Sequence, residues 1–236
     1  MTHNAQRLRP PRTAPDARKP SMHSDKPLFD PALHHFGLSG QVPEFIVIGA
    51  MDGISFDEFH GFVRTYGWSG LFVEPIPEQF RRLQANFAQL GCSPNNRYEN
   101  SAIAEHNGSV KMLTIAQEAV DTGQVHSCFG GMSAIYPPRN GLASAGDAET
   151  VARYGTLVEV PCITLQTLLS RHEVQRIDIL CIDAEGWDWR ILRQLDFQRF
   201  RPRLIRAEYI NLDADEKQAI VDLFERHHYL THLDGM

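Results

Sequence analysis

Short apolar runs recur along the chain, and each one ends where polar or turn-forming residues begin. The runs most typical of buried parallel strands are residues 45–48, 71–74, 177–182 and 204–207. The stretches between them have apolar residues three or four positions apart, as in residues 78–90, where Phe80, Leu83 and Phe87 share one face of a helix. Because strands and helices alternate, the pattern predicts an α/β fold with a mainly parallel sheet.

Other periodic stretches extend this alternation. Helical spacing predicts further helices at residues 56–66, 164–169, 191–195 and 214–227. Shorter β-rich runs predict further strands at residues 97–100, 109–113, 157–163 and 229–232. The run at 109–113 follows a turn at Gly108, so we expect this strand to be antiparallel.

The N-terminal part of the chain lacks this pattern. Residues 1–26 are rich in Pro, Arg, Ser and His and form almost no apolar clusters, which predicts a disordered tail. Phe29 and Leu33 then belong to an apolar set that can dock as a short arm. We therefore expect a disordered tail and an arm over residues 1–36 and one folded domain over residues 37–236.

A second interruption lies inside the domain, at residues 114–156. This segment is rich in Gly, Ser, Ala and Pro and shows no regular period, and so long an irregular insertion is usually functional or disordered. It also holds apolar residues such as Phe129, Met132 and Ile135, which a purely solvated loop does not need. Two interpretations stay open: a substrate loop or lid that closes over bound molecules, and a segment packed permanently on the sheet.

Composition narrows the possible classes of protein. The 236 residues carry a net charge of −6, which argues against a nucleic-acid backbone as a main partner. The sequence has no apolar run of membrane-spanning length and no signal-peptide core, so we expect no membrane insertion. The four cysteines, Cys92, Cys128, Cys162 and Cys181, are widely spaced and form no C-x-x-C pair. They are typical of reduced thiols and predict a cytoplasmic protein.

The turn after the first apolar run has the residues of a ligand-binding loop. It begins with Gly49 and ends with Gly53, and a helix is expected from Ser55 on. Glycines allow the backbone to approach a ligand, and free N–H groups at a helix start attract oxygen or carboxylate groups. A turn of G-x-x-x-G form also fits an ordinary connection between a strand and a helix.

Acidic residues stand at the predicted carboxyl ends of three strands, as Glu74, Asp183 and Glu208. In an open parallel sheet these ends line the ligand crevice, and an acidic residue after the second strand is where such folds bind ribose hydroxyls. Glu185 follows Asp183 closely, so both carboxylates can reach one crevice. Such a pair can orient a hydroxyl, take its proton or hold a cation, and the alternative for Asp183 is a structural turn.

Taken together, these stretches resemble the FkbM family of methyltransferases, a branch of the class I S-adenosylmethionine-dependent fold. The matching stretches, in the family's order, are residues 48–55, 67–75, 100–103, 164–165, 177–186 and 201–208. The resemblance implies a Rossmann-like three-layer sandwich, S-adenosylmethionine as cofactor, and O-methylation of a hydroxyl. The acceptor it implies is a small molecule, either a sugar or a natural product.

The resemblance also implies roles for single residues. Those expected to bind the cofactor are Gly49, Ala50, Asp52, Gly53, Glu74, Ser101, Ala102 and Asp183. Of these, Glu74 would hold the ribose hydroxyls, while Ser101 and Ala102 would flank the adenine. Asp183 and Glu185 would lie beside the methyl group and the acceptor.

A sugar hydroxyl is a poor nucleophile, so a base or a metal ion is needed as its proton leaves. The catalytic candidates are Asp183, Glu185 and His126. If a divalent metal takes part, Asp183 and Glu185 are its expected ligands. His126 lies in the irregular segment, where a histidine is also commonly a solvated surface residue.

Two features depart from the family pattern. The family has an acidic residue two positions before the first glycine of the turn, where this chain has Val47, so Asp52 or Asp57 would replace it. A class I sheet also ends with a strand inserted antiparallel, but this sequence stops at Met236, just after residues 229–232. We therefore expect the last antiparallel strand to be missing and the C-terminal sheet edge to be incomplete or completed by a second copy.

Two other functions stay open. An NAD-linked oxidoreductase has a similar fold, but the turn from Gly49 to Gly53 lacks the G-x-G-x-x-G spacing that binds a pyrophosphate. A non-catalytic module of the same fold would bind a partner through its arm and its open sheet edge. Val47 and the short C-terminus favour this last alternative.

Overall fold

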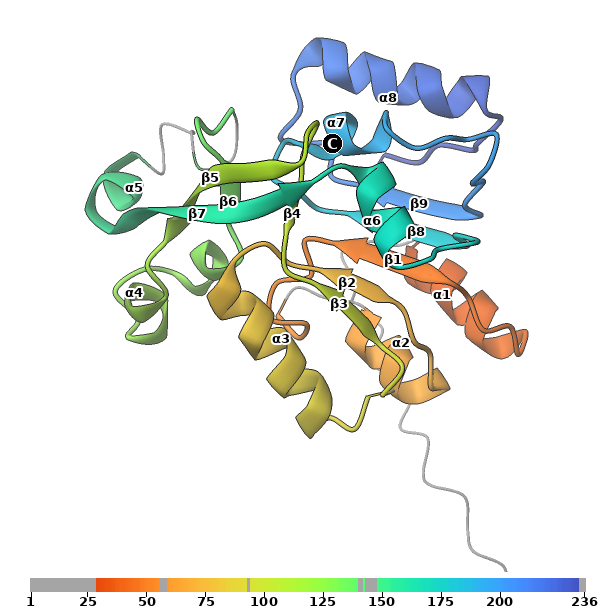
Figure 1. Cartoon of the computed structure of the whole chain (residues 1–236), viewed down its shortest axis with the longest axis horizontal. Coiled ribbons are helices and arrows are strands. Elements are labelled where there is room, and N and C mark those ends of the chain that lie inside the picture. The colour runs from red at the N-terminus through yellow and green to blue at the C-terminus, as the bar shows by residue number, and fades with distance from the viewer. Residues whose placement is uncertain (1–28, 56–58, 93, 140–141, 143–147, 234–236) are drawn as a thin grey trace, which may run out of the picture.

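The computed structural model describes residues 29–55, 59–92, 94–139, 142 and 148–233. Its centre is a five-stranded sheet in the order β3-β2-β1-β8-β9, with every neighbouring pair parallel (Figure 1). The strands are β1 (Phe45–Ile48), β2 (Leu71–Val73), β3 (Arg97–Glu99), β8 (Ile179–Ile182) and β9 (Leu204–Ala207). The predicted α/β class with a mainly parallel sheet is confirmed. The strand order reverses between β1 and β8, which is where such sheets bind ligands.

One face of this sheet is covered by three helices from the first half of the chain. They are α1 (Phe29–Leu38), α2 (Phe59–Tyr66) and α3 (Pro77–Gln89). Phe45 and Val47 of β1 point to this face, where they join a buried cluster with Leu33, Phe59 and Phe87 from the three helices. Because successive side chains of a strand alternate between faces, the other two residues of β1 point the opposite way.

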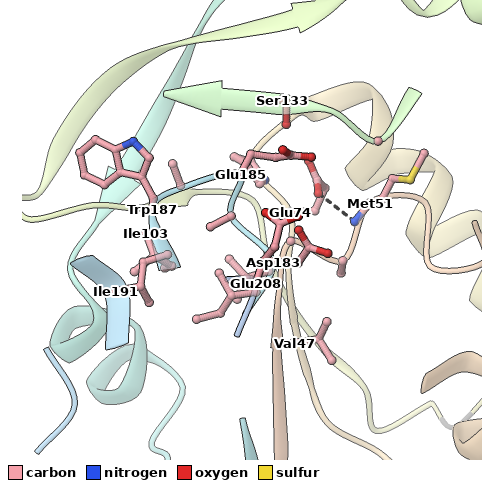
Figure 2. Close-up of a pocket in the computed structure, with 18 of the residues that line it drawn as sticks. Val47, Met51, Glu74, Ile103, Ser133, Asp183, Glu185, Trp187, Ile191 and Glu208 are labelled. Carbon is pink, nitrogen blue, oxygen red and sulfur yellow. Dashed lines mark hydrogen bonds between the residues drawn. The ribbon is translucent and has the colours of Figure 1, made fainter. Parts of the chain in front are cut away.

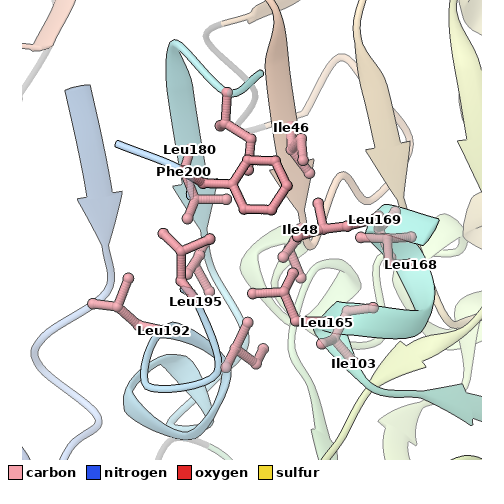
Figure 3. Packing of buried hydrophobic residues seen from close by; sticks show 14 of the residues in the cluster. Ile46, Ile48, Ile103, Leu165, Leu168, Leu169, Leu180, Leu192, Leu195 and Phe200 are labelled. Carbon is pink, nitrogen blue, oxygen red and sulfur yellow. The ribbon is translucent and has the colours of Figure 1, made fainter. Parts of the chain in front are cut away.

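The opposite face is covered by helices from the second half of the chain. They are α6 (Leu165–Arg171), α7 (Asp188–Leu192) and α8 (Ala214–Arg226). Ile46 and Ile48 of β1 pack here with Leu165 of α6 and Leu192 of α7 (Figure 3). Ile220 of α8 belongs to the same buried cluster. Helices on both faces complete a three-layer sandwich. The central strands β1, β2 and β8 are buried throughout, which explains why they read as unbroken apolar runs.

A second sheet of four strands lies beside the first, in the order β4-β7-β5-β6 (Figure 1). Its strands are β4 (Ala102–Ile103), β5 (Gly108–Ile115), β6 (Ser133–Ile135) and β7 (Gly155–Ile163). The predicted antiparallel character of residues 109–113 is confirmed, because β5 runs antiparallel to both β6 and β7.

The insertion at residues 114–156 contains more regular structure than its sequence suggests. It holds α4 (Gln117–Asp121), the short 3-10 helix η1 (Ser127–Gly130), strand β6 and α5 (Ala148–Tyr154). Leu113, Ile115 and Leu142 form a small buried cluster, against which Phe129 and Met132 of the insertion pack. The expectation of an irregular segment is therefore wrong for the residues described here. Each of these elements is short, and contacts with β5 and β7 hold them in place.

The predicted strand at residues 229–232 is also wrong. The hydroxyl of Tyr229 donates a hydrogen bond to the carbonyl of Pro202 at 2.6 Å, and Leu230 is fully exposed. Tyr229 thus packs against the core, while residues 230–233 are exposed and join no strand. Strand β9 pairs with β8 on one side, and within residues 148–233 and the other described ranges no strand pairs with its outer side.

The arm expected before the domain is helix α1, and Phe29, Leu33 and Phe36 are buried within the core. The tail predicted over residues 1–26 and the predicted helix residues 56–58 lie outside the described residues. Every helix in the described part of the chain falls short of the length and apolar character that a bilayer span requires.

Candidate active site

The carboxyl ends of β1, β2, β8 and β9 open into one pocket of about 580 Å³. The second sheet and residues 128–135 of the insertion border it on the other side. Its acidic side chains form one group. Figure 2 shows Glu74, Asp183, Glu185 and Glu208 gathered in the middle of the pocket, with an apolar wall of Ile103, Trp187 and Ile191 on one side of them.

The turn after β1 requires glycine at its first position. Gly49 has a φ of +86°, and a Cβ atom there would lie 1.9 Å from the carbonyl oxygen of Asp183. The glycine therefore allows the ends of β1 and β8 to touch. The N–H groups of Gly49 and Ala50 both donate to the carbonyl of Val73 at 3.0 Å, and that of Met51 donates to the Glu74 side chain. These three amides are thus used within the protein and are not open to an anion.

Glu74 is a buried carboxyl group at the end of β2, with 4% of its surface exposed. Its Oε2 atom accepts the N–H of Met51 at 2.9 Å, and its Oε1 atom accepts that of Ile76 at 2.8 Å. Burial raises the pKa of Glu74 to about 7, although the two backbone hydrogen bonds act in the opposite direction. Because a carboxylate oxygen can accept two hydrogen bonds, each oxygen keeps a position for a ligand hydroxyl.

Ser101 and Ala102 line the pocket beside the end of β3. The Ser101 hydroxyl donates to Glu99 at 2.6 Å, and Glu99 also bonds to Arg171 and His172. The serine hydroxyl is therefore held by the buried Glu99 carboxylate, which the partly exposed Arg171 and His172 neutralise. Two small side chains at this position leave room for a flat group beside them.

A cluster of acids occupies the loops after β8 and β9. The side-chain amide of Asn211 donates to Oε2 of Glu185 at 3.0 Å and to Oε2 of Glu208 at 2.9 Å. Burial raises the pKa of Glu185 to about 8, and the nearby charges of Glu208 and Asp183 add to the rise. A carboxyl group with such a pKa exchanges its proton close to neutral pH, which is typical of acid–base residues.

Asp188 ties these two loops together, and its part was not apparent in the sequence. It is completely buried at the start of α7, where it accepts the N–H of Ala184 at 3.3 Å and that of Glu208 at 2.8 Å. Burial, together with the charges of Asp183 and Glu208, raises the pKa of Asp188 well above its ordinary value. The only sequence signals were an acid in the first turn of a helix and, for Asn211, an amide soon after a strand end.

Three predicted site residues do not line the pocket, namely Asp52, Gly53 and His126. The Asp52 carboxylate accepts hydrogen bonds from the backbone and the hydroxyl of Ser55, so it shapes the turn. Gly53 packs its backbone against α3. His126 is exposed, and its Nδ1 atom caps η1 by accepting the N–H of Cys128 at 3.2 Å. The remaining predicted residues all line the pocket, as Gly49, Ala50, Glu74, Ser101, Ala102, Asp183 and Glu185.

We examined whether other side chains join Asp183 and Glu185 in a possible metal site. Across the part of the chain that the structure describes, no group of three or more His, Cys, Asp or Glu side chains is placed to hold a metal ion. Glu185 is instead bonded to the Asn211 amide.

The insertion is attached to helices on both faces of the main sheet. The Gln79 side chain of α3 donates to the carbonyl of Gly130 at 2.9 Å. At the other end, Arg139 forms ion pairs with Asp213, at 2.7 Å, and with Glu216, the two residues that cap α8. Between these attachments the insertion contributes Gly131, Met132, Ser133 and Ile135 to the pocket, and Cys128 lines it just before the first attachment.

Comparison with protein families matches residues 48–231 to a family model described as a methyltransferase FkbM domain. This range includes the turn at Gly49, Glu74 and both acidic loops. Comparison with curated proteins gives no match, and neither does comparison with solved structures.

Proposed function

Because the chain belongs to the FkbM methyltransferase family, we propose that it transfers the methyl group of S-adenosylmethionine to a hydroxyl of a sugar or natural-product small molecule. The observation that carries this proposal is that Glu74 and the pair of Asp183 and Glu185 face one pocket, although they lie far apart in the sequence. Such a transfer needs one group that accepts hydrogen bonds from the cofactor ribose and another that accepts a proton, both at the same pocket.

The pocket has groups that fit this cofactor. Its volume of about 580 Å³ suits a ligand of that size, since small-molecule sites span roughly 300–1,000 Å³. Glu74 would accept the ribose hydroxyls, and Ser101 and Ala102 would flank the adenine. Gly49 and Ala50 would offer backbone surface to the amino-acid part. When bound, the cofactor supplies an electrophilic methyl group.

The acidic loops would then handle the acceptor. Asp183 and Glu185 would orient its hydroxyl, and Glu185 would take the proton as the oxygen becomes a nucleophile. Burial of Glu185 makes its carboxylate a stronger base than an exposed one. The insertion would cover the pocket and keep water from competing with the acceptor.

Charge limits the class of acceptor. Four carboxylates line the pocket, as Glu74, Asp183, Glu185 and Glu208, while the basic side chain that lines it is Arg206. When these acids are ionised, as Glu185 must be to take a proton, an acceptor with a phosphate or carboxylate near the reacting hydroxyl would meet like charges here. The apolar wall at Trp187 suits the face of a sugar or carbocyclic ring. We therefore propose a neutral or cationic hydroxylated ring as acceptor.

We also propose that the protein works in the cytoplasm. The support is that all four cysteines of the sequence are thiols in the structure and none forms a disulfide.

The proposed function is tested by incubating the protein with S-adenosylmethionine labelled on its methyl group and with a panel of small hydroxylated compounds. The panel pairs neutral sugars and polyols with their phosphorylated forms. We expect label in a neutral compound and none in its phosphorylated partner. Label in no compound, with the cofactor shown to bind, would contradict the proposed acceptor class.

Replacing Glu74 by glutamine should weaken cofactor binding by at least about tenfold, because one charge-assisted hydrogen bond is worth roughly 1.5–3 kcal/mol. In the wild type, affinity should rise with pH through about 7, since the raised pKa leaves Glu74 increasingly ionised there. Calorimetric titration with S-adenosylhomocysteine at several pH values measures both effects. Glu78→Gln is the control, because Glu78 is a partly exposed acid at the start of α3 and does not line the pocket. Equal affinities for Glu74→Gln and Glu78→Gln would refute the ribose assignment.

Replacing Arg139 by glutamine should loosen the insertion without changing cofactor affinity. Two partly exposed ion pairs with the cap of α8 are lost, so we expect roughly a two- to tenfold rise in the acceptor KM. Cleavage by a protease between α4 and β6 should become faster, and this readout needs no acceptor. Arg81→Gln, which removes a helix-surface ion pair, is the control. Unchanged cleavage in the Arg139 variant would show that these ion pairs do not hold the insertion.

A further inference from the structure

The Asn211 amide joins two carboxylates that come from different loops. Its Nδ2 atom has two hydrogens, and Glu185 and Glu208 each accept from this atom through Oε2, at 3.0 and 2.9 Å. Glu185 follows β8 and Glu208 follows β9, so the amide connects the ends of adjacent parallel strands. An amide N–H that points to a carboxylate stabilises its charged form and fixes its direction.

The backbone around Asn211 is fitted to this contact. Gly186, the residue after Glu185, has a φ of +91°, and a Cβ atom there would lie 3.1 Å from the Asn211 carbonyl oxygen. Glu185 itself has a φ of +49°, which is uncommon for a residue other than glycine. The Asp188 carboxylate accepts hydrogen bonds from the N–H groups of Ala184 and Glu208. Asp188 therefore holds the backbones of the two loops together, and Asn211 holds the side chains of Glu185 and Glu208.

We propose that Asn211 is a positioning residue that holds Glu185 and Glu208 side by side at the acceptor end of the pocket, so that Glu185 receives the proton of the acceptor hydroxyl. This inference rests on the proposed methyl transfer. The acceptor O–H bond breaks, its proton moves to the Glu185 carboxylate, and the electron pair stays on the acceptor oxygen. The other charged groups near the pair are Asp183 and Asp188 after β8, Glu74 after β2 and Arg206 on β9.

The test compares Asn211→Leu, which keeps the size but removes both donors, with Asn211→Gln, which keeps them. In Asn211→Leu we expect kcat to fall at least about tenfold and the pH midpoint of kcat to move up by about one unit, the effect of losing one charge-assisted hydrogen bond. Cofactor affinity and the acceptor KM should stay unchanged. Asn211→Gln should restore part of the rate and of the midpoint. A fall in kcat with an unmoved midpoint, or no rescue by glutamine, would overturn the positioning role.

A second readout separates this inference from the proposed function. Carbon-13 labelling of glutamate carboxyl groups allows Glu185 to be titrated by NMR, with its resonance identified by its loss in Glu185→Gln. We expect the Glu185 midpoint to rise in Asn211→Leu whether or not any acceptor is methylated. Identical titration curves in wild type and Asn211→Leu would contradict the inference. A shifted curve without any methyl transfer would refute the proposed function and keep the Asn211 contact.

Discussion

Replacing Glu185 by glutamine is expected to lower methyl-transfer turnover by about 10²–10⁴-fold, the usual contribution of a general base. The glutamine has almost the same shape and can still bond to Asn211, but it cannot take a proton. Cofactor affinity should be unchanged, because the proposed cofactor contacts are made by Glu74, Ser101 and the turn at Gly49 rather than by the Glu185 side chain. Rapid mixing of enzyme, labelled cofactor and acceptor measures the single turnover directly.

Glu173 offers a matched control for this substitution. It is also a glutamate with a left-handed backbone, at a φ of +50°, but it is exposed and lies outside the pocket. Glu173→Gln should therefore keep the wild-type rate. Wild-type turnover in Glu185→Gln would make Glu185 a structural residue. If a chelator abolishes turnover and a divalent ion restores it, then a metal rather than Glu185 assists the loss of the proton.

The same variant has an expected effect on stability. In the folded protein the pKa of Glu185 is about 8, whereas in the unfolded chain it has its ordinary, lower value. As the pH rises between these two values, the unfolded chain releases this proton more readily than the folded protein, so the free energy of unfolding falls. Glu185→Gln should therefore unfold at a higher temperature than wild type at alkaline pH, and at the same temperature in acid. The Glu185 carboxylate would thus lower the stability of the fold at the alkaline pH at which it is ionised and able to take a proton.

Replacing Gly49 by alanine is expected to destabilise the fold by at least about 2 kcal/mol and to abolish cofactor binding. The new Cβ atom would lie 1.9 Å from the Asp183 carbonyl oxygen, which is backbone and cannot turn aside. The left-handed φ of +86° adds strain for any residue but glycine. Urea unfolding gives the loss of stability, and calorimetry with S-adenosylhomocysteine gives the loss of binding.

Gly61→Ala is the control, because Gly61 lies in α2 with open space around its Cα and no left-handed backbone. Alanine is favoured over glycine within a helix, so this variant should be as stable as wild type or slightly more stable. Equal stabilities for Gly49→Ala and Gly61→Ala would mean that β1 and β8 do not meet as described.

The parallel sheet could be predicted because its strands are buried on both faces. Such strands appear as unbroken apolar runs, and the acids that follow them fall at one sheet edge for topological reasons. Glu74, Asp183 and Glu185 could therefore be assigned to one pocket from the sequence alone. The strand predicted at residues 229–232 does not form, because within this run Tyr229 packs on the core while residues 230–232 are exposed.

The insertion and the outer parts of the site could not be predicted for a different reason. Elements as short as α4 and β6 have weak local preferences, and they form through distant contacts such as that between Gln79 of α3 and Gln117 of α4. Asn211 and Asp188 have no motif of their own. Their roles depend on contact between the loops after β8 and β9, and the spacing of residues in the sequence does not predict this contact.

The central claim is that the pocket at the ends of β1 and β2 binds S-adenosylmethionine. Calorimetric titration of the wild-type protein with S-adenosylmethionine and, separately, with NAD tests it most directly. We predict saturable binding of one S-adenosylmethionine per chain and no binding of NAD. Binding of NAD alone would indicate an oxidoreductase, and binding of neither would indicate a methyltransferase-fold module without catalytic function. Either of these results would contradict the account.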